Sequence, residues 1–249
     1  MLKNPASLLC ARVKGGELKR FITLVAVLLA GGWLCSLLLR VLPPAWDPFA
    51  PLSVTDAPTL VTRYKLKRLA ANPEACFAVL QQARTQGYLS YTRPGTQQGR
   101  CPLVDPVRIT GFGDVTLSST FLSSCTLAVS STMLVTQTLK PMATRELGSP
   151  LTRIDHLGSY ACRNIYHRAE GRLSEHATAD AWDLSGFRLQ NGQRISVLSH
   201  WRGGDDRSRW LHLVFARSCH LFGNALGPEY NAAHANHFHL GMRGFGLCR

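Results

Sequence analysis

The longest apolar stretch of the chain runs from Phe21 to Leu39 and contains no charged residue. Its 19 residues are just enough to cross a hydrocarbon core of about 30 Å as a helix. Lys19 and Arg20 precede the stretch, and Arg40 follows it. Because basic residues are retained on the cytoplasmic side, we expect a cytoplasmic segment over residues 1–20, a transmembrane helix over 21–39 and an external remainder.

A cleaved signal peptide and a buried core helix are the other interpretations of this stretch. The stretch stays rich in Leu to its end, and Arg-Val-Leu-Pro-Pro follows where a signal peptidase site would have small residues. Trp33 and Leu34 before Cys35 also make a poor lipoprotein cleavage site. We therefore expect an uncleaved anchor.

Beyond the anchor, the polar and apolar positions predict a linker and then helices. Residues 40–58 are rich in proline, which is typical of an extended linker. Residues 59–71 have the pattern of a basic helix. Asn72-Pro73-Glu74 is typical of a helix start, with Asn as the N-cap and Pro in the first turn. A third helix is expected over 124–140.

From residue 150 the pattern changes to short alternations of apolar and polar residues, which are typical of strands. We expect strands over 151–156, 181–189 and 194–201, with a hairpin at Asn191-Gly192 between the last two. A helix from about 207 to 222, capped by Asp206, and a short strand from His237 or Phe238 should follow. This order predicts an α+β domain over residues 59–249, with a small antiparallel sheet flanked by helices.

The formal net charge of +13 raises the possibility of nucleic-acid binding. Five of the basic residues lie before residue 21, where the anchor explains them. The rest of the chain has no Lys/Arg-rich helix, stacking-aromatic motif or zinc-finger spacing. We therefore expect no nucleic-acid partner, although attraction to wall or lipid phosphates remains open as an accessory.

Six of the eight cysteines lie beyond the apolar stretch, whereas Cys10 precedes it and Cys35 lies within it. An even number of cysteines in an oxidising compartment predicts three disulfides but leaves their connectivity open. We expect sequential pairing: Cys76–Cys101, Cys125–Cys162 and Cys219–Cys248.

Two short stretches contain most of the residues suited to metal chemistry. One contains Ser174, His176 and Asp183, and the other contains His234, His237 and His239. Residues two apart on a strand point to the same face, so His237 and His239 should face one site. Two histidines and one aspartate form a donor set that suits catalytic zinc, with a fourth position open.

Asp180 is a second candidate for the carboxylate ligand, because at four residues from His176 it could share a helical face with it. Asp183 is favoured, since the alternating residues that follow predict a strand that would hold it rigidly. The remaining five histidines are expected on the surface or in the core: His156, His167, His200, His212 and His220.

The two stretches resemble the signatures of the zinc metallopeptidase group that joins D-Ala-D-Ala carboxypeptidases, the penicillin-insensitive murein endopeptidase and the hedgehog signalling domain. Four further segments extend the resemblance: Gly158-Ser159-Tyr160, Cys162-Arg163, Leu226-Gly227-Pro228 and the terminal Cys248-Arg249. Together they resemble the bacterial extensin-like C-terminal family over roughly residues 70–249.

The resemblance implies a role for each matching position. It implies that His176, Asp183 and His239 bind Zn2+. It also implies that His237 is the general base and that His234 is a further active-site histidine. Arg163, and secondarily Arg168, would bind a substrate carboxylate or an oxyanion.

Two positions depart from the group. Ala179 stands where Gly is usual, and Asn236 stands where another branch has an acidic base. Because Asn cannot act as a base, that role falls to His237.

The fold implied by the resemblance is the hedgehog/D-Ala-D-Ala-peptidase-like zinc fold. The implied function is a periplasmic zinc peptidase, anchored in the inner membrane, that acts on peptidoglycan cross-bridge or stem peptides. The alternative is a non-catalytic, zinc-containing wall-binding or scaffold module, since one fold can serve binding as well as cleavage. Carboxypeptidase or endopeptidase action and the oligomeric state stay open.

Overall fold

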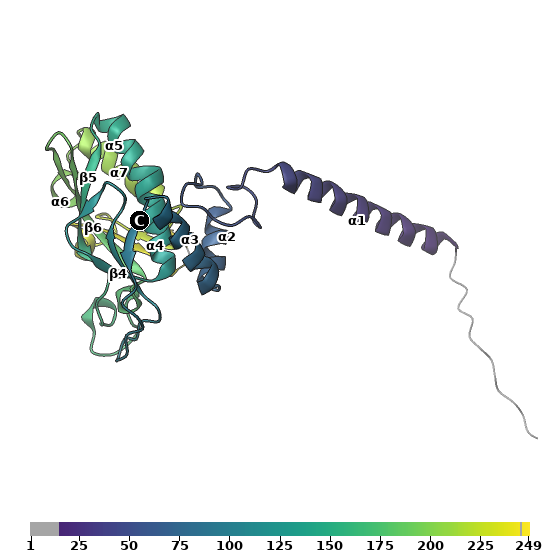
Figure 1. The fold of residues 1–249 in the computed structure, drawn as a ribbon, viewed down its shortest axis with the longest axis horizontal. Coiled ribbons are helices and arrows are strands. Elements are labelled where there is room, and N and C mark those ends of the chain that lie inside the picture. The colour runs from purple at the N-terminus through teal and green to yellow at the C-terminus, as the bar shows by residue number, and fades with distance from the viewer. Residues whose placement is uncertain (1–14, 245) are drawn as a thin grey trace, which may run out of the picture. The chain divides into compact units, whose positions relative to one another are not determined.

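The computed structural model describes residues 15–244 and 246–249, and it divides after Pro43 into two compact units. In the first unit, α1 (Gly15–Val41) contains the whole predicted span (Figure 1). Its residues from Gly16 to Val41 are long and apolar enough for a membrane span or a signal sequence. Of the expected cytoplasmic segment, residues 1–14, including Cys10, lie outside the described residues.

The second unit begins at Pro44, so most of the expected linker over 40–58 belongs to the folded domain. Leu52 and Val54 are buried, and Gln137 Nε2 donates a hydrogen bond to the Val54 carbonyl at 3.0 Å. Helix α2 (Thr62–Ala70) follows. The Lys65 ammonium on α2 donates to the Pro44 carbonyl at 2.6 Å, so the proline-rich segment is held against this helix.

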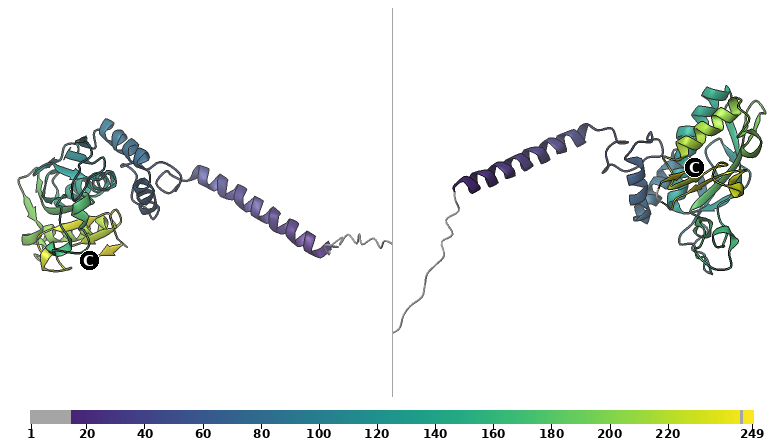
Figure 2. Two further views of the ribbon diagram at one scale, coloured as in Figure 1. Left: turned by 90° about the horizontal axis from the view of Figure 1, so that it is seen from below. Right: turned by 180° about the vertical axis from the view of Figure 1, so that it is seen from behind.

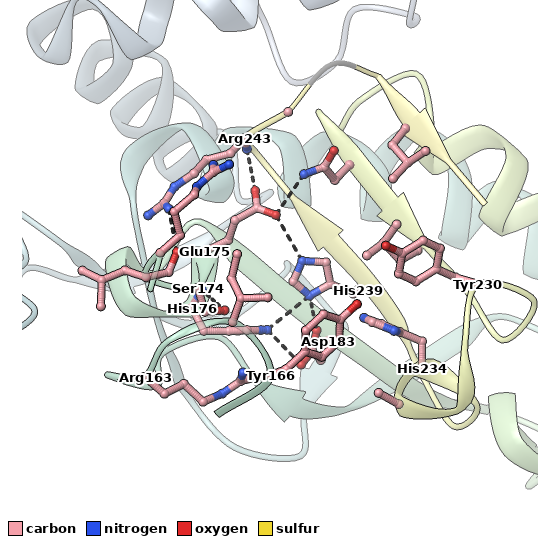
Figure 3. A pocket seen from close by; sticks show the side chains of 18 of the residues that line it. Arg163, Tyr166, Ser174, Glu175, His176, Asp183, Tyr230, His234, His239 and Arg243 are labelled. Atoms are coloured by element: carbon pink, nitrogen blue, oxygen red, sulfur yellow. Dashed lines mark hydrogen bonds and ion pairs between the residues drawn. The ribbon is translucent and has the colours of Figure 1, made fainter. Parts of the chain in front are cut away.

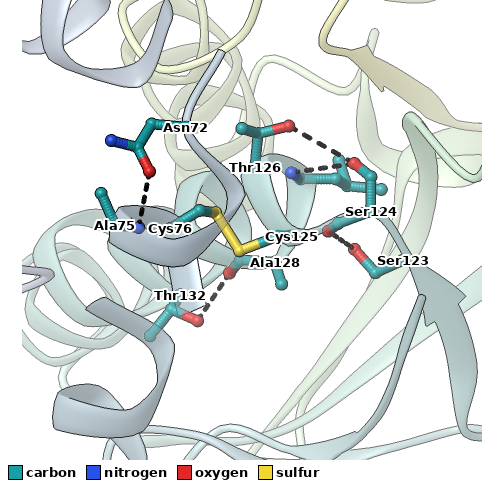
Figure 4. Close-up of a disulfide and its surroundings, with 10 residues drawn as sticks. Asn72, Ala75, Cys76, Ser123, Ser124, Cys125, Thr126, Ala128 and Thr132 are labelled. Atoms are coloured by element: carbon teal, nitrogen blue, oxygen red, sulfur yellow. Dashed lines mark hydrogen bonds between the residues drawn. A yellow bond between two sulfur atoms is a disulfide. The ribbon is translucent and has the colours of Figure 1, made fainter. Parts of the chain in front are cut away.

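Helices α3 (Pro73–Thr85) and α4 (Cys125–Leu134) pack together and are joined by the disulfide Cys76–Cys125 (Figure 4). The predicted cap of α3 is confirmed, because Asn72 Oδ1 accepts a hydrogen bond from the Ala75 amide at 3.0 Å. Ser124 caps α4 in the same way. Cys76 and Cys125 meet because each lies in the first turn or two of its helix.

The predicted pairings Cys76–Cys101 and Cys125–Cys162 are therefore wrong. The second disulfide is Cys101–Cys162, while the predicted Cys219–Cys248 is confirmed. The sequential rule succeeded only for the last pair in the chain and failed where packing between distant segments decides which cysteines meet.

The predicted third helix extends further than residue 140. A π-helical segment, Val135–Leu139, continues α4 into α5 (Lys140–Leu147), and Gly148 ends the helix with a left-handed backbone at φ 66°. The π segment ends two residues before Pro141, which cannot donate a backbone hydrogen bond.

The later predicted helix is α7 (Asp206–Ser218), and its cap is not Asp206 but Asp205, whose carboxylate accepts from the Ser208 amide at 2.9 Å. The predicted strand over 194–201 is also only partly right. Strand β7 (Arg194–Ser196) gives way to α6 (Val197–His200), because the Ser196 hydroxyl caps a helical turn there.

The mixed α+β class is confirmed, whereas the small antiparallel sheet is wrong. The main sheet has seven strands, and six of them lie in the order β10 (Leu247–Cys248), β8 (Asn224–Leu226), β9 (Phe238–Gly241), β6 (Ala181–Leu189), β5 (Leu151–Gly158) and β3 (Thr116–Leu117). Strand β7 also pairs with β6. The outer pairs β3–β5 and β10–β8 are parallel. These outer strands span two or three residues each, which is too short to give a periodic signal.

A second, three-stranded sheet contains β1 (Ser90–Thr92), β2 (Val107–Gly111) and β4 (Phe121–Ser123). Helices α4, α5 and α7 lie on one face of the main sheet (Figures 1 and 2). Trp182 and Leu184 of β6, with Phe238 and Leu240 of β9, point into the core on this side. Strand alternation therefore turns Asp183 and His239 to the opposite face.

Candidate metal site and cleft

The central strands of the main sheet place two of the predicted ligands side by side. Asp183 on β6 is the direct cross-strand partner of His239 on β9, so the two side chains share one face. His239 Nδ1 lies 3.0 Å from the Asp183 Oδ1 atom. The flanking Trp182 and Phe238 are fully buried in the core and fix the register of this pair.

The third predicted ligand, His176, lies on a 3₁₀ turn, Glu175–Thr178. The Ser174 hydroxyl caps this turn by accepting from the His176 amide at 3.4 Å. His176 Nδ1 donates to the carbonyl of Ser159 at 3.0 Å, so the other ring nitrogen, Nε2, faces the site. That nitrogen lies 3.2 Å from Asp183 Oδ2 and 3.2 Å from His239 Nδ1.

The donor atoms of His176, Asp183 and His239 thus all lie within 4.8 Å of one another (Figure 3). The rival carboxylate, Asp180, is engaged elsewhere, because it accepts from the Thr178 hydroxyl at 2.5 Å and lies 3.6 Å from the Arg243 guanidinium. The preference for Asp183 over Asp180 agrees with this geometry.

The charges of this cluster are strongly coupled. Burial alone would raise the pKa of Asp183, but hydrogen bonds from His176 and His239 outweigh burial and hold that pKa well below its usual range. Burial alone would lower the pKa of His239, but its hydrogen bonds to Asp183 and Glu175 raise that pKa to about 9. The pocket therefore stabilises positive charge beside Asp183, which is also what a bound cation requires.

Glu175 is a member of the cluster that the sequence did not single out. Its carboxylate lies 3.3 Å from His239 Nε2, on the side of the ring opposite Asp183 (Figure 3). It also accepts hydrogen bonds from Asn224 Nδ2 at 3.0 Å and from the Arg243 amide at 2.6 Å. Glu175 therefore holds Nε2 of His239 and leaves Nδ1 for the site.

The space for the Glu175 carboxylate depends on a glycine. A Cβ atom at position 241 would come within 2.5 Å of both carboxylate oxygens, so only Gly241 fits beneath it. The signal for Glu175 was present in the sequence as an acidic residue next to a predicted ligand.

His237 and His234 lie on the cleft side of the cluster. His237 Nε2 is 3.7 Å from Asp183 Oδ1, and its Nδ1 contacts Asn236 Oδ1 at 2.8 Å. Burial is the main cause that lowers the pKa of His237. Burial and the neighbouring His237 lower the pKa of His234 to about 4, and its ring centre lies 5.3 Å from that of His237. Both imidazoles are therefore neutral near pH 7, with His237 Nε2 directed to the site.

The cluster forms part of the wall of a cleft of about 710 Å³. Arg163 lines it, as predicted, together with Arg172 and Arg243. The predicted Arg168 is not among the described residues that line the cleft; instead its carbonyl accepts a hydrogen bond from Asn164. The cleft wall contains three arginines and two acidic residues, Glu175 and Asp183. Arg243 pairs with Asp180, whereas Arg163 and Arg172 form no ion pair among the described residues, so these two arginines suit an anionic ligand.

A loop with strained backbone borders the same cleft. Tyr166 and His167 have positive φ angles of 55° and 57°, which cost roughly 1 kcal/mol or more each for residues other than glycine. The Tyr166 hydroxyl accepts from Asn231 Nδ2 at 3.3 Å and faces Tyr230 on the other rim. His167 is exposed, as expected, and it also lines the cleft.

Comparisons with known proteins identify the family of the chain. No curated protein matches the chain significantly. No solved structure matches it either. Residues 74–249 match the family described as extensin-like protein C-terminus, which covers more than half of the chain and contains every residue of the cluster. The chain therefore belongs to the extensin-like protein C-terminus family.

Proposed function

We propose that the protein is a zinc-dependent peptidase that hydrolyses amide bonds in peptidoglycan peptides outside the cytoplasm. The observation that carries the proposal is the convergence of His176 Nε2, His239 Nδ1 and the Asp183 carboxylate in the wall of an open cleft.

The donor set fits zinc. Two imidazole nitrogens and one carboxylate are the donor types of catalytic zinc sites, and each histidine has a hydrogen-bond partner on its other ring nitrogen. When bound, zinc would supply Lewis acidity that activates water and polarises a carbonyl group.

The chain's own residues supply the remaining functions. His237 is placed to take a proton at Nε2, because its Nδ1 contacts Asn236 and its Nε2 lies near Asp183. The same imidazolium would then return the proton to the leaving amine. Arg163 on the cleft wall would hold a substrate carboxylate or the developing oxyanion by charge-assisted hydrogen bonds.

Peptidoglycan is proposed as the substrate from the resemblance of the two motifs to murein peptidases. Three disulfides favour an oxidising compartment, and helix α1 would anchor the domain in the inner membrane with its C-terminal domain in the periplasm. Stem and cross-bridge peptides also present carboxylates, which suit a cleft lined by three arginines.

The first test is zinc content followed by digestion. We expect the purified protein to contain close to one zinc per chain and to release new muropeptides from isolated peptidoglycan. His237→Ala should retain zinc and lose release of muropeptides, while the exposed control His220→Ala should retain both. Less than about one-fifth zinc per chain after gentle purification would overturn the metal site.

The same experiment separates the alternative function. Bound zinc without any muropeptide release by the wild type would support the alternative of a non-catalytic wall-binding or scaffold module.

A further inference from the structure

Helix α2 and the loop before it carry a second surface, away from the zinc-site residues. Its exposed members are Trp46, Phe49, Leu60, Tyr64, Lys67 and Arg68, which together we call the α2 surface. Leu60 is 87% exposed and Phe49 is 69% exposed, which is unusual for large apolar residues of a folded domain. The surface thus combines protruding apolar side chains with two cations.

These side chains lie together. Leu60, Tyr64, Lys67 and Arg68 follow helical spacing and share the exposed face, while the opposite face of α2 is buried. The loop is held beside this face, because the Arg68 guanidinium donates to the Pro48 carbonyl at 3.0 Å. A second hydrogen bond, from the Thr59 hydroxyl to the Ala45 carbonyl at 2.8 Å, also holds the loop in place. Figure 1 shows the loop alongside α2.

The positive charges of the α2 surface are not neutralised by acidic side chains, although the Arg68 guanidinium also contacts the Pro48 carbonyl and the Tyr64 ring. Within the described part of the chain, neither Lys67 nor Arg68 forms an ion pair with a carboxylate. The two acidic residues of the loop are occupied locally: Asp47 accepts from the Phe49 amide at 2.8 Å, and Asp56 accepts from the Ser53 amide at 3.0 Å.

We propose that the α2 surface docks onto the anionic headgroup region of a lipid bilayer. Aromatic and apolar side chains that protrude beside Lys and Arg are the composition of interfacial membrane contacts. A soluble polyanion would use the cations but would leave Phe49 and Leu60 in water. In the sequence, the surface follows closely on α1, since Trp46 comes five residues after Val41.

The choice of a lipid partner rests on the anchoring by α1 in the proposed function, and it does not depend on hydrolysis. Docking would also affect access to the cleft. Arg63 of α2 lies beside Gly246, which lines the cleft, so a docked α2 would hold that rim near the membrane surface.

The test uses residues 44–249 without α1. This unit is compact and contains its own core and all three disulfides, so we expect it to fold without the anchor. We expect it to sediment with vesicles of phosphatidylglycerol and phosphatidylcholine in equal parts, and not with vesicles of phosphatidylcholine alone. Lys67→Glu with Arg68→Glu should lower the partition coefficient at least about tenfold. Phe49→Ser with Leu60→Ser should lower it by about the same factor.

The matched controls change exposed residues elsewhere on the unit. Arg194→Glu with Arg217→Glu, and Leu198→Ser, should leave the partition coefficient within about twofold of the wild type, with unchanged circular dichroism in every variant.

Two outcomes would overturn the proposal. An equal loss in Arg194→Glu with Arg217→Glu would show general electrostatic attraction instead of docking through the α2 surface. If Lys67→Glu with Arg68→Glu lowers the partition coefficient but Phe49→Ser with Leu60→Ser does not, the partner is a soluble polyanion. Failure of anchoring is a separate result, because it is measured on the full chain by extraction of membranes with carbonate.

Discussion

One wall of the cleft is made of paired strands and the other of loops, and the two hold their functional groups by different means. Asp183 and His239 lie opposite each other on β6 and β9, over a fully buried core. His176 and Arg163 lie on turns. The Ser174 cap holds the turn of His176, and the disulfide at Cys162 lies directly before Arg163.

The difference assigns separate tasks to the two walls. Sheet register fixes positions along the whole strand, so the strand wall suits the two candidate ligands Asp183 and His239, and the capped turn brings the third, His176, to them. Turns held by individual hydrogen bonds can adjust to a ligand, so the loop wall suits substrate contacts. His176 and Glu175 link the two walls, because both contact His239 from the loop side.

The largest effect is expected from the strand wall. Asp183→Ala should lower zinc affinity about a thousandfold or more, because it removes one of three donors and leaves two histidines near each other without the carboxylate. Zinc affinity is measured by competition with a chelator. Ser185→Ala, also on β6, is the control and should bind zinc like the wild type. Unchanged zinc affinity in Asp183→Ala would contradict the proposed metal site.

Glu175→Gln tests the link between the walls. We expect zinc affinity to fall about 10- to 100-fold, because Gln leaves the orientation of the His239 ring poorly fixed. Glu170→Gln, on the neighbouring loop, should have no effect on affinity. If Glu175→Gln lowers the melting temperature and leaves zinc affinity intact, Glu175 supports the fold alone and does not orient His239.

The free energy of unfolding of the metal-free protein should depend on pH, because the pKa of His239 is raised in the folded state. The pKa of His239 is raised from 6.5 to about 9, so its stabilising contribution is fully present below pH 6.5 and is lost as the pH rises through 9. The loss is about 3 kcal/mol at most in the free energy of unfolding.

Urea unfolding of the metal-free protein across this pH range measures the effect, and His239→Gln should abolish it. Because zinc must displace the His239 proton, zinc affinity should rise about tenfold per pH unit over the same range. An affinity independent of pH would contradict the coupling of His239 to Asp183 and Glu175.

The smallest effect is expected from the loop wall. Tyr166→Phe removes the hydroxyl that accepts from Asn231, a contact that contributes about 1 kcal/mol or less. We expect a rise in KM of about fivefold at most and no change in zinc affinity. Loss of zinc binding by Tyr166→Phe would contradict the assignment of substrate contacts, and not metal binding, to this loop.

The sequence predicted what depends on local pattern. Asn72 was recognisable as a cap, and the alternation from Asp183 onward predicted both β6 and the choice of Asp183 over Asp180. The two motifs predicted His176, Asp183 and His239 as members of one cluster, because the residues that define each motif lie close together in the chain.

What depends on distant segments was missed. Strands β3, β8 and β10 exist only through pairing with longer neighbours, so no pattern marks them. The role of Glu175 required knowing that β9 passes beneath it with Gly241 at the contact. Arg168 and Arg172 look equivalent in the sequence, yet only Arg172 lines the cleft.

Two of the three disulfides are interleaved, and this pattern has a consequence for how the chain matures. Cys101 lies between Cys76 and Cys125 in the chain, yet it pairs with Cys162. A chain that enters an oxidising compartment from its N-terminal end presents Cys76 and Cys101 before either true partner, so the first bond to form would be the wrong one. Reaching the native pattern then requires exchange of that bond. Production of this protein should therefore depend on a disulfide isomerase as well as an oxidase.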